Sequence, residues 1–141
     1  MLLVKTPPRG VDSYGSGAYL ASRGRRLHNG VDFSAVAGSD VASLTCGKVT
    51  KIGFPYRYDP DNPAKSKYRY VEVTTDGNRL RYFYLTPAVK LGDNIKTGDI
   101  VGSVQDLTEV YKGIKNHVHF EVKNERNNFL DPNEFLETLH G

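Results

Sequence analysis

The sequence predicts a mainly β protein, an antiparallel fold of many short strands. From residue 31 onward, short stretches alternate polar and apolar residues or are rich in β-branched and aromatic residues. Turn residues separate these stretches. A single segment carries a helix signal, with Asp131 as the N-cap and Pro132 at the first helical position. We therefore expect one short helix, at the C-terminus.

The expected strands follow one another in chain order: 31–33, 41–44, 47–53, 70–74, 80–85, a strand containing Val101 and Val104, and 117–122. The dipeptide Asp76-Gly77 predicts a tight hairpin between two of them. The phrase from Val89 to Gly102 places Gly-Asp twice, which is typical of a tight corner in a small sandwich or barrel.

Length and charge limit the possible classes of protein. The chain has 141 residues with 19 Lys and Arg against 16 Asp and Glu, so its formal charge is +3. We expect a single domain over 1–141, with an N-terminal arm at 1–25 and a core at 26–137, and a monomer. The small positive charge does not favour nucleic acid, and no apolar run is long enough to span a membrane. Cys46 is the one cysteine, which excludes an intrachain disulfide.

Two segments could flank a binding surface. The loop from Phe54 to Lys67 holds aromatic, proline and charged residues; it could wall a groove or be a covered surface insertion. The arm carries a basic cluster at Arg23, Arg25 and Arg26. That cluster is read as a solvated rim, with an anionic ligand as the alternative.

The four histidines are the candidates for chemistry at neutral pH. His117 and His119 lie two residues apart in an expected strand, so their rings share a face while Val118 and Phe120 face the core. Zinc is one partner for two such imidazoles, and satisfaction within the core without metal is the other. His140 lies next to the C-terminus and is read as a bystander.

A second motif strengthens the zinc interpretation. His28 and Asp32 flank a turn with Gly30, so a turn followed by a strand could bring both side chains to one point. An imidazole and a carboxylate are suitable zinc ligands. The two motifs together offer two imidazole nitrogens and one carboxylate as ligands, with one histidine left over. A catalytic zinc site needs three protein ligands and an open position for water.

These motifs resemble those of the lysostaphin-type (M23) zinc metallopeptidase family. The resemblance rests on 28–33, 38–41, 47–49, 92–102, 117–122 and 131–136. It implies an antiparallel β-sandwich (a duplicated hybrid motif) with a groove across one sheet. It also implies a zinc endopeptidase that cuts peptide cross-links or stems of bacterial peptidoglycan. By that resemblance His28, Asp32 and His119 are the zinc ligands, and His117 is the catalytic histidine that does not bind metal.

The sequence departs from the family at Tyr84. Active members usually carry a second catalytic histidine in a Tyr-x-His-Leu strand, whereas this chain has Tyr82-Phe83-Tyr84-Leu85. A phenol, with a pKa of ~10, can donate a hydrogen bond to an oxyanion but is a poor base at neutral pH. The alternative function is therefore a zinc-containing binding or signalling module with weak or no turnover.

The same sub-pattern is most similar to that of a secreted vertebrate signalling member of the family. The chain lacks the paired cysteines of such a protein and shows no signal peptide, so we expect a bacterial or bacteriophage protein, endolysin-like, that acts at the cell wall. We expect the loop at 54–67 and the arm from Tyr14 to Arg26 to flank the groove and to set substrate choice.

Overall fold

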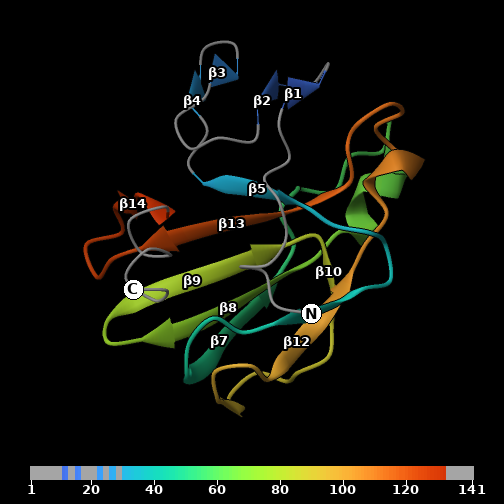
Figure 1. Cartoon of the computed structure of the whole chain (residues 1–141). Coiled ribbons are helices and arrows are strands. Elements are labelled where there is room, and N and C mark those ends of the chain that lie inside the picture. The colour runs from blue at the N-terminus through green and yellow to red at the C-terminus, as the bar shows by residue number, and fades with distance from the viewer. Residues whose placement is uncertain (1–10, 13–14, 17–21, 24–25, 28–29, 133–141) are drawn as a thin grey trace.

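The computed structural model describes residues 11–12, 15–16, 22–23, 26–27 and 30–132, and it is built almost entirely of strands (Figure 1). In chain order the elements are β1 (Val11–Asp12), β2 (Gly15–Ser16), β3 (Ser22–Arg23), β4 (Arg26–Leu27), β5 (Val31–Ser34), β6 (Asp40–Ala42), β7 (Gly47–Gly53), the 3-10 helix η2 (Pro63–Lys67), β8 (Tyr70–Thr75), β9 (Asn78–Phe83), β10 (Leu85–Pro87), β11 (Asn94–Ile95), β12 (Ile100–Val104), the 3-10 helix η3 (Leu107–Glu109), β13 (His117–Lys123) and β14 (Phe129–Leu130).

Within these described residues, two antiparallel sheets form the body of the fold. The larger sheet has seven strands; six run in the order β11-β7-β8-β9-β13-β14, and β5 pairs with β13. The smaller sheet has the order β10-β12-β6. In Figure 1, β5, β13, β9, β8 and β7 follow one another across the larger sheet, and β12 and β10 form the second layer. The expected antiparallel β-sandwich is confirmed, and none of the described helices is long and apolar enough to cross a membrane.

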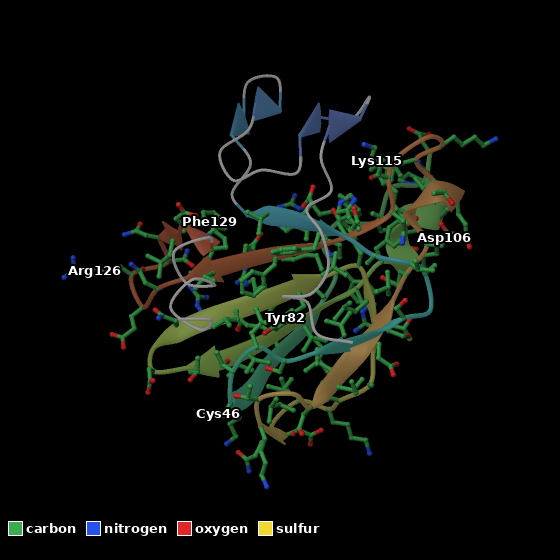
Figure 2. The ribbon with its side chains drawn as sticks, viewed as in Figure 1. Cys46, Tyr82, Asp106, Lys115, Arg126 and Phe129 are labelled. Carbon is green, nitrogen blue, oxygen red and sulfur yellow. The ribbon has the colours of Figure 1, made fainter. Side chains whose placement is uncertain are left out.

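One apolar core joins the two sheets. Side chains of alternate residues on β13 enter it, as the strand pattern predicts, and they are completely buried: Val118, Phe120 and Val122. The smaller sheet contributes Val41, Leu85, Val101 and Val104. Tyr82 is also fully buried, and its hydroxyl accepts a hydrogen bond from the backbone N–H of Leu44 at 3.0 Å (Figure 2). The apolar side of β13 is thus fixed in the core, so the opposite side is left for polar residues.

The expected turns are present. Asp76 and Gly77 join β8 to β9 with φ values of 47° and 80°, the left-handed backbone of a two-residue hairpin. In the repeated Gly-Asp phrase, the carboxylates of Asp93 and Asp99 each accept a hydrogen bond at 2.8 Å from the backbone N–H three residues earlier. The turn residues therefore set the pairing of the strands that they connect.

The prediction of one continuous strand over 80–85 is wrong, because the strand is interrupted at Tyr84. Tyr84 has φ of 72°, in the left-handed region, and separates β9 in the larger sheet from β10 in the smaller. Its N–H donates to the carbonyl of Arg69, and its carbonyl accepts from the N–H of Gln105. The change of sheet therefore occurs at the residue that departs from the family motif.

Other expectations have mixed outcomes. In the arm the structure describes three strands of two residues, β1 to β3, and β4 follows directly after it. The 3-10 helices η2 and η3 carry no signal that the sequence reading recognised. The expected C-terminal helix falls on residues 133–141, outside the described part of the chain.

Candidate active site

The candidate site lies where β5 and β13 run side by side (Figure 1). Asp32 of β5 is directly opposite His119 of β13, and His117 is two residues before His119. Because opposite residues of an antiparallel pair point to the same face of a sheet, all three side chains meet. Asp32 and His117 are buried, with 2% and 4% of their surface exposed. Asp32 is therefore brought to His117 and His119 by the register of one strand pair.

The ring of His119 lies between two carboxylates. Its Nδ1 is 2.8 Å from Oδ1 of Asp32, and its Nε2 is 3.0 Å from Oε1 of Glu121. Burial alone lowers the pKa of His119, but the hydrogen bonds and charges of both carboxylates outweigh it and raise the pKa to about 9. The surroundings of this ring therefore favour a positive charge.

The ring of His117 is oriented by the backbone. Its Nδ1 lies 2.8 Å from the carbonyl oxygen of Lys115, in the loop that leads into β13 (Figure 2). A carbonyl can only accept, so Nδ1 carries a hydrogen and the neutral ring has its lone pair on Nε2. That Nε2 lies 3.5 Å from Oδ2 of Asp32. The basic nitrogen of His117 therefore faces the carboxylate that His119 also contacts.

These residues suit a divalent cation. Nδ1 of His119 and Oδ1 of Asp32 lie 2.8 Å apart, and imidazole nitrogen with carboxylate oxygen is a zinc donor set. No group of three His, Cys, Asp or Glu residues is arranged to hold a metal ion within the described part of the chain. Two of the three predicted ligands, Asp32 and His119, lie together, while His28 falls outside the described residues. His140, the predicted bystander, also falls outside them.

Tyr84 lies beside His117, with ring centroids 5.5 Å apart and the rings perpendicular. Its hydroxyl is hydrogen-bonded to that of Tyr56 at 3.0 Å. Burial raises the pKa of Tyr56, and so do its contacts with Tyr84 and Tyr111, so this phenol stays neutral. Tyr84 thus lies next to His117 and is hydrogen-bonded to a second, neutral phenol.

The loop at 54–67 supplies that second phenol, because Tyr56 belongs to it. Lys65 of the same loop lies over the rings of Tyr56 and Tyr111, at 5.6 and 5.5 Å from their centroids. This loop therefore contacts the site, whereas Tyr14 and most of the arm fall outside the described residues, and the groove itself stays a prediction.

The sequence reading missed Glu121, Arg81 and Glu72, which form a buried row of charges beside His119. A signal for Glu121 was available, since it is two residues after His119 and so shares its face. Arg81 and Glu72 could not be assigned to the site without the register of three strands.

Comparison with known proteins supports the family that the motifs resemble. The family model described as "Peptidase family M23" matches residues 26–132. Leukocyte cell-derived chemotaxin-2 of Mus musculus is 36% identical over 113 residues, which cover 80% of this chain and 71% of that protein. This agrees with the predicted similarity to a vertebrate member.

Solved structures also match. The catalytic domain of the antimicrobial peptidase lysostaphin from Staphylococcus simulans is 25% identical, with a TM-score of 0.60, over 89% of this chain and 90% of that one. Helicobacter pylori Csd3 is 26% identical with a TM-score of 0.62; the match covers 92% of this chain but spans only 32% of Csd3. The family model covers most of the chain, and the sandwich and the paired His and Asp motifs agree with it, so the chain belongs to peptidase family M23.

Proposed function

We propose that this protein is a zinc metalloendopeptidase that hydrolyses peptide bonds of bacterial peptidoglycan. The observation that carries the proposal is that buried His117 and Asp32 meet His119 on one strand pair of an M23 fold. A solved relative of the same fold is a peptidase, lysostaphin, and the peptidoglycan substrate is what the motif resemblance implies. We further propose that the protein works as a monomer at the bacterial cell wall.

The metal would be held by Asp32 and His119, with His28 as the third ligand. Zinc, when bound, supplies Lewis acidity for the substrate carbonyl and for water. The role of Asp32 is to present a buried carboxylate to the cation. The role of His119 is to present its Nδ1 on the side of Asp32.

His117 is proposed as the general base. Its Nδ1 hydrogen is committed to the carbonyl of Lys115, so its Nε2 can accept a proton from the attacking water. Tyr84 is proposed as a neutral donor to the oxyanion that develops at the substrate carbonyl. Its place beside His117 supports this role.

The proposal is tested by incubating zinc-loaded protein with purified peptidoglycan and analysing the released fragments by mass spectrometry. Cleavage is expected at one type of peptide bond. The His117→Ala variant should keep one zinc per chain and lose cleavage, because the residue binds protons rather than metal. Uncut peptidoglycan, stem peptides and oligoglycine with fully zinc-loaded protein would sink the peptidase proposal.

The loop at 54–67 is proposed to select the substrate, since it reaches Tyr84 through Tyr56. Deleting Tyr58 to Lys67 should change which peptide bond is cut while zinc content stays the same. The expected readout is a changed fragment pattern in the same digest. An unchanged pattern would remove the loop from substrate choice.

A second function has its own supporting observation. Tyr84 replaces the histidine usual in active members, and the chain shares 36% identity with a protein named as a chemotaxin. The alternative is a zinc-containing binding or signalling module of the same fold. A silent parent protein that gains cleavage with Tyr84→His would favour this alternative.

A further inference from the structure

We propose that Glu121 is a positioning residue for the metal site, and that Arg81 and Glu72 hold it in place. The proposal rests on the proposed function only in that a metal ion binds at Asp32 and His119. Its substance is a row of buried charges that crosses three strands of the larger sheet and ends on the ring of His119.

Glu121 contacts the ring of His119. Oε1 of Glu121 lies 3.0 Å from Nε2 of His119. An ionised carboxylate can only accept, so Nε2 carries a hydrogen, and in the neutral ring the lone pair then lies on Nδ1. Nδ1 is the nitrogen that faces Oδ1 of Asp32 at 2.8 Å. Both nitrogens of the metal-free ring thus donate to a carboxylate, and Glu121 would keep the hydrogen on Nε2 when a cation takes the place of the one on Nδ1.

Arg81 and Glu72 hold Glu121 in place. Arg81 lies directly opposite it on β9, and Glu72 lies directly opposite Arg81 on β8. Nη1 of Arg81 is 3.6 Å from Oε2 of Glu121, and its Nε is 2.7 Å from Oε2 of Glu72. The hydroxyl of Thr50 donates to the other oxygen of Glu72 at 2.8 Å. Each oxygen of Glu121 thus has its own partner, and the backbone ladder holds every member.

All three side chains of the row, Glu121, Arg81 and Glu72, carry charge. The row holds two carboxylates and one guanidinium, and their side chains are only 6% to 14% exposed. Apolar residues would serve a purely structural sheet at least as well, because burying charge is costly. A negative charge behind a ligating imidazole raises its basicity and fixes its ring. Glu121, whose contact with Arg81 is longer than that of Glu72, lies at the end of the row that touches His119, where such a role requires a carboxylate.

The test measures metal binding and does not depend on catalysis. Zinc affinity is determined by competition with a chromophoric chelator, and the Co²⁺-substituted protein supplies a d–d absorption spectrum. Glu121→Met removes the acceptor and should weaken zinc binding about 10- to 100-fold. Glu121→Gln keeps an acceptor oxygen without the charge, so we expect a smaller loss and a shifted Co²⁺ spectrum. Arg81→Met should weaken binding in the same direction.

The matched control is Val122→Ala. Val122 follows Glu121 on the same strand but is buried on the opposite face, in the core. This variant should lower the melting temperature and leave zinc affinity and the Co²⁺ spectrum unchanged. Equal losses of affinity in Val122→Ala and Glu121→Met would mean that only sheet stability is involved, and the proposal would be overturned.

The remaining outcomes separate this inference from the proposed function. Zinc binding in Glu121→Met within twofold of the parent overturns the inference alone. If that variant does not fold, Glu121→Gln decides: unchanged affinity together with an unchanged Co²⁺ spectrum overturns it. A parent that binds zinc but cuts no peptidoglycan, with a weakened Glu121→Met, supports the inference while the peptidase proposal fails. A parent that binds no metal overturns both.

Discussion

The role of the Tyr84 hydroxyl can be separated from that of its ring by the Tyr84→Phe variant. The ring packs against Tyr56, Tyr68, Phe83 and His117 at centroid distances of 6.4, 5.8, 6.2 and 5.5 Å, and phenylalanine keeps all four contacts. The hydroxyl makes the 3.0 Å hydrogen bond to Tyr56, so its loss should cost about 1 kcal/mol of unfolding free energy.

The catalytic effect should be much larger. Loss of one oxyanion donor lowers kcat about 100- to 1,000-fold, or roughly 3–4 kcal/mol. The assay is peptidoglycan cleavage by Tyr84→Phe, with rates normalised to bound zinc and stability measured by urea unfolding. An oxyanion donor is identified when the loss in kcat, expressed as a free energy, clearly exceeds the loss in unfolding free energy.

Tyr56→Phe is the control, because it breaks the same hydrogen bond from the other side, together with the one to Tyr111, and leaves the Tyr84 hydroxyl in place. It should cost at least as much unfolding free energy and change kcat by less than about threefold, well below the loss of an oxyanion donor. If Tyr84→Phe keeps kcat within twofold of the parent, or if both variants lose it equally, the assignment of Tyr84 as the donor is refuted.

Two further predictions concern stability. Tyr82→Phe leaves the buried N–H of Leu44 without its acceptor and should cost about 1–3 kcal/mol by urea unfolding. Tyr58→Phe, at a residue that is 70% exposed, should cost almost nothing, and equal effects would contradict the buried bond. In metal-free protein, folding raises the pKa of His119 from 6.5 to about 9, so its contribution is complete below pH 6.5 and is lost as pH rises through 9. The melting temperature of chelator-treated protein should therefore fall between pH 6.5 and 9, and a flat profile would show that the two carboxylates do not act on this ring.

Local patterns were sufficient for most of the sandwich. Alternation on β13 placed Val118 and Phe120 in the core, and Asp76-Gly77 predicted the hairpin that the structure shows. The change of sheet at Tyr84 was missed, because the apolar pattern continues across it and a tyrosine with positive φ is uncommon. The bend is held by backbone hydrogen bonds from Tyr84 to Arg69 and from Gln105 to Tyr84, and both partners are distant in sequence.

In the candidate site, too, local motifs were predictable and contacts between strands were not. His117, His119 and Asp32 could be predicted because each motif is short and the resemblance joins them. The row formed by Glu72 and Arg81 could not, since it depends on the register of three strands rather than on spacing along one. Cross-strand neighbours become visible only when the pairing of the strands is known.

The proposed peptidase is tested most directly by mass spectrometry of purified peptidoglycan after digestion with zinc-loaded protein, with His117→Ala run in parallel at equal zinc content. We predict new peptide termini at one type of bond with the parent protein and none with the variant. Intact peptidoglycan in both digests, with one zinc bound per chain, would contradict the assignment of His117 and Tyr84 to a working peptidase site.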